Sequence, residues 1–379
     1  METIILIAIL AFSLLIAIEF AYGLAVNRNN YRLNDAISSL SQGALSQIAS
    51  VFTQLFQIGI YTAVFSSITL FHHDEFWSHW YGYLIAVVAY DFCDYWLHRT
   101  SHEVAVFWAA HVVHHQSQEF NFTTALRQES LYPVLGFPFF LPLAVSGIPP
   151  STFAIAGFVV LFYQFWIHTE HIGKLGWFDR FFSTPSNHRV HHAVNAQYVD
   201  KNYAAIFIIW DRMFGTFAEE KEKCVYGTIE PFNSWDPIWS VSHVFWKLLK
   251  DAIATRSWKD KLKIWFMPPG WKPHDLIVPI QHKTAPAEEN PLYNPPMNQA
   301  MVWFACVHFI ILFGALFLFL WYEDTLPTIL LIGVATQIIA GLWVVGAVMQ
   351  GRLKISQGLL LELFLLVSLS CGNYLLQSY

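Results

Sequence analysis

Long apolar runs separated by short polar segments dominate the pattern of this chain. A helix needs roughly 20 apolar residues to cross a bilayer. By that measure several runs predict full membrane spans, and two shorter runs around Ser146-Gly-Ile-Pro-Pro150 predict either two more spans or a re-entrant hairpin. The predicted spans are Ile4–Val26, Ala44–Phe71, Trp80–Leu97, Val302–Trp321, Thr328–Met349 and Gln357–Leu376, and the shorter runs are Leu131–Val145 and Ala154–Ile167.

Composition supports this pattern and indicates an integral membrane protein. Hydrophobic residues make up 55% of the chain, charged residues 13%, and the mean hydropathy is +0.41. Soluble domains carry about 25% charged residues. The first apolar run has neither a basic leading segment nor a small-residue cleavage site, so it is interpreted as a retained span. The four cysteines form no C-x-x-C pair, which argues against a zinc knuckle or a disulfide framework. We therefore expect an all-α, multi-span bundle.

The positive charges predict how the bundle is oriented, because Lys and Arg gather in cytoplasmic loops. With the N-terminus outside and 131–167 as a hairpin, all 21 basic residues fall on one side. The loops left outside, such as 71–79 and 322–326, carry none. Residues 172–298 are the least apolar part and hold most of the basic residues. This layout places every histidine group on the cytoplasmic face, at the ends of predicted spans.

Histidines recur at spacings that put several imidazoles on one face of a helix. The motif HRTSH begins at His98, HVVHH begins at His111, and a second H-x-x-H-H begins at His188. Positions i, i+3 and i+4 are neighbours on a helix, and neutral imidazole is the commonest protein ligand for first-row metals. These imidazoles exceed what one ion can take, so the pattern predicts two metal ions. The predicted ligands are His98, His102, His111, His114, His115, His188, His191 and His192.

Further polar residues beside these motifs are candidates for the same site. His168 ends an apolar run on the same side and is predicted as a ninth ligand. His171 is left undecided, because an interfacial histidine needs no metal to explain it. Metal-bound imidazoles usually donate their far N–H to an acceptor. Apart from Asp94 and Glu103, each candidate acid could equally cap a helix or pair with an arginine. The candidate acceptors are Asp94, Glu103, Glu170, Asn187, Asp200 and Asp211. His308, inside a predicted span, is interpreted as a structural hydrogen-bonding group.

An all-imidazole site with two metals leaves the chemistry open. Iron would allow O2 activation and insertion of oxygen into a C–H bond, whereas zinc would activate water for hydrolysis. Lipid chains offer unactivated C–H bonds that hydrolysis cannot attack, so the membrane setting favours oxygenation. A histidine-rich metal-binding or transport protein is the non-enzymatic alternative. A transporter would carry its ligands near the midplane, whereas these histidines gather at one face.

In order and spacing, HRTSH, HVVHH and NHRVHH resemble the motifs of the fatty acid hydroxylase / sterol desaturase superfamily of membrane di-iron oxygenases. This resemblance covers about residues 80–217. The first two spans, the C-terminal block and several short stretches resemble its alkylglycerol monooxygenase branch. Those stretches are Arg32–Asp35, Asp94–Arg99, Trp166–Glu170, Thr184–His192, Asp200–Tyr203, Trp210–Thr216 and Pro268–Trp271.

The resemblance implies a helical membrane domain that holds two iron ions on the histidines named above and hydroxylates a lipid C–H bond with O2. For the alkylglycerol branch it implies attack at the ether-linked carbon of a glycerol ether lipid, release of a fatty aldehyde, and tetrahydrobiopterin as reductant. Glu103 matches a functionally important acid of that branch and is the catalytic candidate. His168 matches a third histidine group, whereas His171 departs from the commonest family pattern. The alternative is a sterol, carotenoid or fatty acyl hydroxylase or desaturase with a protein electron donor.

These observations divide the chain into four parts: a two-span region (1–79), the catalytic core (80–217), a cytosolic connection (218–298) and a three-span block (299–379). We expect a membrane lipid, O2 and an external electron donor, either a pterin or a redox protein, as partners, and no nucleic acid. We expect the bacterial inner membrane, or the endoplasmic reticulum membrane if the protein is eukaryotic.

Overall fold

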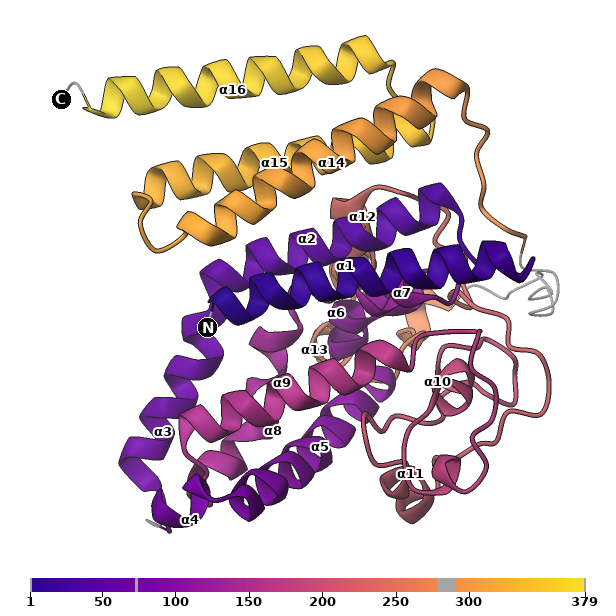
Figure 1. The fold of residues 1–379 in the computed structure, drawn as a ribbon, viewed down its shortest axis with the longest axis vertical. Coiled ribbons are helices and arrows are strands. Elements are labelled where there is room, and N and C mark those ends of the chain that lie inside the picture. The colour runs from indigo at the N-terminus through magenta and orange to yellow at the C-terminus, as the bar shows by residue number, and fades with distance from the viewer. Residues whose placement is uncertain (1, 72–73, 278–290, 378–379) are drawn as a thin grey trace.

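The computed structural model describes residues 2–71, 74–277 and 291–377, and over these residues it is helical. An antiparallel bridge between Ala193 and Tyr226 is isolated, and no strand forms in the described ranges. The long helices run side by side, and shorter helices and loops gather at one end of the bundle (Figure 1). The all-α prediction is therefore confirmed.

Three helices of the described chain are long and apolar enough to cross a membrane. They are α1 (Glu2–Ala25), α14 (Gln299–Tyr322) and α15 (Thr328–Met349). A fourth span is possible where α2 (Leu33–Gln54) continues through a π-helical turn, η1 (Leu55–Gly59), into α3 (Ile60–Ile68), with a bend of 41°. These helices leave many large apolar side chains exposed, as a lipid-facing surface requires. The last helix, α16 (Ile355–Gln377), lies along α15.

The helix that carries the first histidine motif is α5 (Trp80–Glu103). It is long enough to span, but Asp91 and Asp94 lie inside it and it is less apolar than the spans above, so the predicted span Trp80–Leu97 is not supported. The helix continues without a break through His98 and His102. The membrane-side helix and the first metal motif therefore form one rigid element.

Two short apolar helices, α8 (Tyr132–Val145) and α9 (Pro150–Trp166), pack beside α5. They are joined at Gly147, whose φ of 94° suits glycine and whose missing side chain lets Phe71 O approach within 2.2 Å of the Cβ position. Their lengths of 14 and 17 residues fit a short hairpin better than two full spans.

Most of the remaining elements are short, and they cluster mainly at the end of the bundle where α5 stops. Polar caps start several of them: Thr184 Oγ1 accepts the N–H of Asn187 at the start of α10, and Asp236 Oδ1 accepts two N–H groups at the start of α12. The α12 helix packs against α6, α2 and α15, and so joins the two halves of the molecule. One of these elements, α4 (Asp74–Ser78), lies at the opposite end of the bundle. The others are α6 (Ala105–His115), α7 (Phe122–Ala125), η2 (Phe178–Arg180), α10 (Pro185–His191), α11 (Ile209–Phe214), α12 (Pro237–Ala254), α13 (Trp258–Lys263) and η3 (His274–Leu276).

Candidate metal centre

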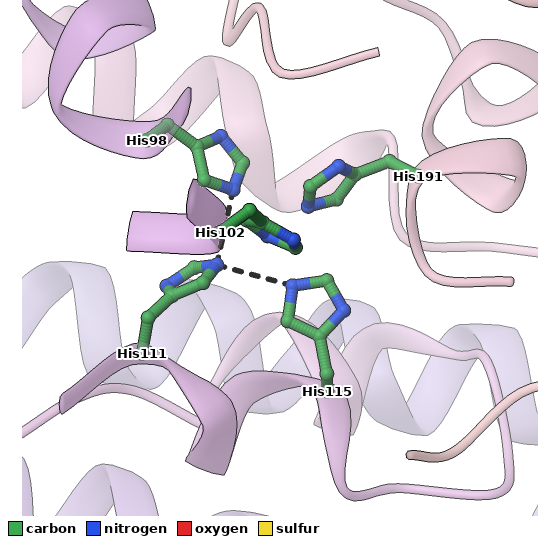
Figure 2. A group of neighbouring side chains, drawn as sticks. All are labelled: His98, His102, His111, His115 and His191. Carbon is green, nitrogen blue, oxygen red and sulfur yellow. Dashed lines mark hydrogen bonds between the residues drawn. The ribbon is translucent and has the colours of Figure 1, made fainter. Parts of the chain in front are cut away.

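Nine buried histidines converge in two neighbouring groups beside the end of α5. Within each group every histidine offers a ring nitrogen, and these nitrogens lie within 4.8 Å of one another. Figure 2 shows the rings of the first group turned toward a common centre. The first group is His98, His102, His111, His115 and His191, and the second is His114, His168, His188 and His192. The structure thus brings together all nine histidines that were predicted as ligands.

Two helices supply ligand candidates to both groups. In α6, His111 and His115 face the first group and His114 faces the second. In α10 and its C-cap, His188 and His192 face the second group and His191 faces the first. Each H-x-x-H-H motif therefore divides its three rings between the two groups. The i, i+4 pair stays together, while the i+3 ring, about 60° around the helix, reaches the neighbouring group.

Several ring nitrogens that point away from the centres are held by oxygen atoms, whereas the buried Nδ1 of His188 has no hydrogen-bond partner in the described structure. Backbone carbonyls accept from Nδ1 of four rings. Because a carbonyl oxygen can only accept, these four imidazoles carry their proton on Nδ1 and have a bare lone pair on Nε2. The pairs are His98 with Tyr203 O at 2.6 Å, His114 with Arg127 O at 3.1 Å, His168 with Gln164 O at 2.7 Å and His191 with Lys201 O at 3.0 Å.

The Nε2 atoms face one another, which suits a cation between them. Neighbouring Nε2 atoms lie 2.9–3.3 Å apart, as in His98–His111 at 3.1 Å and His114–His168 at 3.3 Å. The buried Nε2 atoms of His102 and His191 have no hydrogen-bond partner in the described structure. Facing lone pairs repel one another unless a cation lies between them. Two nitrogens that each bind a metal ion at about 2.1 Å, at a right angle to each other, would lie about 3.0 Å apart, which matches the Nε2–Nε2 distances. The donor set therefore fits one divalent metal ion in each group.

Burial favours the neutral form, which binds metals, in four of these imidazoles. It lowers the pKa of His114 to about 3 and the pKa of His111, His168 and His188 well below the ordinary value for histidine. Burial also raises the pKa of the Glu129 carboxyl to about 8. Glu129 Oε1 lies 2.6 Å from His111 Nδ1, and a cation on His111 would favour its charged form.

The predicted hydrogen-bond acceptors differ in whether they contact a histidine ring. Asp200 lies 3.4 Å from His102 Nδ1, as expected for an outer partner of a ligand. Asp211 does not contact a histidine ring directly. It accepts the N–H groups of Tyr203 and Ala204, and so fixes the carbonyl group of Tyr203 to which His98 Nδ1 donates. The prediction for Asp94 is wrong: its carboxylate accepts from Gln164 at 3.4 Å, while His98 bonds to Tyr203. Asn187 donates to the backbone carbonyls of Asp179 and Phe182, and Glu170 accepts from Tyr226 Oη at 2.9 Å.

Three other residues singled out from the sequence lie outside both groups. Glu103 is half exposed and pairs with Arg99 at 2.9 Å. The His171 ring packs edge-on against Tyr22 of α1, with centroids 5.2 Å apart. His308 of α14 hydrogen bonds to Glu362 of α16 at 2.9 Å, as its interpretation as a structural group anticipated.

Two buried charged residues, Arg127 and Glu19, hold in place the segments that carry the histidines. Arg127 is 1% exposed, and its guanidinium donates to Val113 O at 2.6 Å and to Gln116 Oε1 at 2.8 Å, which fixes the end of α6. Glu19 of α1 accepts from Phe122 N at 2.8 Å and from the hydroxyl of Thr169, the residue after His168. Sequence reasoning missed Glu129, Arg127 and Glu19, because no local spacing links them to the histidines they support.

Comparison with known proteins relates the chain to hydroxylases and monooxygenases. The fatty acid hydroxylase family matches residues 83–216. An alkylglycerol monooxygenase from Xenopus tropicalis is 37% identical over 79% of this chain and 67% of its own length. One from Homo sapiens is 42% identical over 64% of this chain, and the match spans only 54% of the human protein. An ornithine lipid hydroxylase, OlsE, from Rhizobium tropici is 27% identical over 50% of this chain and 58% of its own length. No solved structure matches the chain.

Proposed function

Because the chain belongs to the family of the alkylglycerol monooxygenases, we propose that it is a membrane di-iron monooxygenase that hydroxylates glycerol ether lipids. The observation that carries this proposal is a pair of adjacent groups, one of five and one of four histidines, at the end of a helical membrane bundle. The relatives add the substrate class, since several of them are named alkylglycerol monooxygenases.

The proposed reaction balances with one O2, two electrons and two protons. One oxygen atom enters the C–H bond next to the ether oxygen, and the other leaves as water. The product is a hemiacetal, which breaks into a fatty aldehyde and a glycerol derivative. When bound, the two iron ions would supply the O2 chemistry. We propose an external donor for the electrons, either tetrahydrobiopterin or a redox protein.

The chain's own residues would hold and orient that chemistry. The nine histidines would bind the metals, and the carbonyl oxygens that accept from Nδ1 of four of them would fix those rings so that Nε2 points inward. Glu129 would stay charged beside His111 and offset the charge of the metal. Burial of both groups would keep bulk water from a reactive site. Glu103, at the rim, is the candidate acid outside the ligand set.

The location of the centre supports a substrate drawn from the bilayer. Both groups lie at the end of α5 and beside α9, next to helices that expose apolar surface. The basic residues of the loops argue that this end faces the cytoplasm. We propose the bacterial inner membrane as its place, or the endoplasmic reticulum membrane in a eukaryote.

The test is an aldehyde-release assay on purified protein of measured metal content. Iron-loaded protein receives an alkylglycerol and tetrahydrobiopterin, with single omission of iron, pterin or O2. Aldehyde that needs all three components supports the proposal. Two bound irons without turnover would redirect the search to sterols, fatty acyl lipids and protein electron donors, in line with the weaker likeness to the ornithine lipid hydroxylase. Bound zinc with turnover in the absence of O2 would refute an oxygenase.

A further inference from the structure

The α12 and α13 helices present an apolar face that no described part of the chain covers. On α12 five large side chains along one face are 39% to 69% exposed, and three more continue along and just past α13 at 67% to 81%. These eight residues, here called the outer face, are Ile238, Trp239, Trp246, Leu249, Ile253, Trp258, Leu262 and Phe266. At 100° per residue, those of α12 fall within about 100° of its circumference, the arc of an amphipathic helix.

The opposite face of this pair of helices is anchored to the metal centre. Leu248 and Trp265 pack against Ala105 and Ala109 of α6, the helix that carries three of the nine histidines. Backbone bonds reinforce the contact, since the N–H of Ala105 donates to Met267 O at 2.9 Å and that of Val106 to Trp265 O at 2.9 Å. The outer face is therefore held in one orientation and is not a loosely attached segment.

The start of α12 is fixed at the level where a membrane span ends. Its N-cap, Asp236, accepts from Trp343 Nε1 of α15 at 3.0 Å, and the missing side chain of Gly346 lets Trp235 O approach to 2.3 Å of the Cβ position. Both α15 residues lie in its last two turns, because the helix ends at Met349. The outer face thus begins at the depth where this candidate span ends, which is the depth of the bilayer interface.

Charge around the outer face matches an anionic lipid surface. Residues 237–272 contain seven basic and two acidic residues, a net charge of +5 in a chain whose net charge is −6. Lys250, Lys259, Lys261 and Lys263 stand on the same two helices as the exposed tryptophans. Long lysine stems with terminal charges, together with tryptophan rings, are the side chains that settle at the headgroup layer.

From these observations we infer that the outer face of α12 and α13 is a membrane-interface surface, which lies in the plane of the bilayer and binds anionic lipid headgroups. It would hold α6, and with it both histidine groups, against the leaflet from which a lipid substrate enters. This inference depends on the membrane location of the chain and not on the proposed reaction, so the two can fail separately.

The test measures the depth of one residue of the outer face in a bilayer. A nitroxide label on Leu262→Cys is compared with one on Ala196→Cys, an exposed position in the loop after α10, in nanodiscs of neutral or of partly anionic lipid. The signal of unsubstituted protein, labelled in parallel, is subtracted for the native cysteines. We expect the label at 262 to be several-fold more accessible to O2 than to a water-soluble nickel complex, with the reverse at 196, and a deeper position in anionic lipid.

Other results would overturn the inference. Equal exposure to water at 262 and 196 in both nanodiscs would exclude membrane contact by this face. If the label at 262 is also shielded from the nickel complex in detergent, and this shielding fades when the protein is diluted, the face would be assigned to contacts between copies of the chain. Depth that is the same in both lipids, and unchanged when Lys259, Lys261 and Lys263 are all replaced by Gln, would refute the anionic-lipid part. Sensitivity to that triple substitution in anionic lipid alone would support it.

Discussion

The division of the nine histidines into two groups predicts that one substitution removes one metal ion. His168 belongs to the second group, where its Nε2 lies 3.3 Å from that of His114 and 2.9 Å from that of His188. In His168→Ala the second group keeps three nitrogens, whereas the first group keeps all five. Loss of an outer-shell partner alone costs 10–100-fold in metal affinity, so loss of a direct ligand should cost at least about 100-fold, or about 2.7 kcal/mol.

The chain contains a matched control three residues away. His171 lies on the same segment, but its ring packs against Tyr22 of α1, outside both groups. His171→Ala therefore removes an imidazole of equal size and should leave the metal content unchanged.

The assay is elemental analysis of iron-loaded protein after gel filtration with a competing chelator. Wild-type protein and His171→Ala should retain two ions per chain, and His168→Ala should retain one, with folded protein verified by elution position. Two ions in His168→Ala would remove this residue from the ligand set. Equal losses in both variants would show that the segment acts through folding and not through coordination, and would refute the division into groups.

Three further predictions test the surroundings of the centre. Replacement of the buried Arg127 by Met deprives Val113 O and Gln116 Oε1 of a charged donor, so the free energy of unfolding should fall by about 2–4 kcal/mol in denaturant titrations. The metal should be retained, because His114 bonds to the backbone carbonyl of residue 127 and not to its side chain. Glu103→Ala should lower turnover at unchanged metal content, because Glu103 lies outside both groups; wild-type turnover would exclude it from the reaction. Acid should destabilise the metal-free protein, since the pKa of His114 is about 3 in the fold and about 6.5 when unfolded. The stabilisation is complete above pH 6.5 and declines below it, by about 1.4 kcal/mol between pH 7.5 and 5.5 for this residue, and a flat melting temperature over that range would contradict it.

Local patterns accounted for much of the fold. Apolar runs of sufficient length predicted α1, α14 and α15, because the length of a membrane helix depends on the thickness of the bilayer and not on its neighbours. The predicted span Trp80–Leu97 is not supported, because Asp91 and Asp94 lower its hydropathy. The tertiary contacts of these two carboxylates cannot be read from the apolar run itself.

Distant contacts explain the residues that sequence reasoning missed. Glu19 and Thr169 are 150 residues apart, and Glu129 reaches His111 across the turn between α6 and α8. Such pairs follow no helical period, so only the packing of helices brings them together. The same holds for Asp94, whose spacing one turn before His98 suggested a bond that the fold gives to Gln164.

The sequence by itself determined that the chain is a helical membrane protein with a metal-type histidine inventory, because hydropathy and i, i+4 spacing are local properties of a helix. Tertiary structure decided which histidines share a centre. Rings at i and i+3 on α6 and α10 diverge around the helix axis, and the helices pack so that His114 and His191 each cross to the other group. A single helix cannot specify this division, since each centre is completed by rings from three or more segments that meet only in the folded bundle.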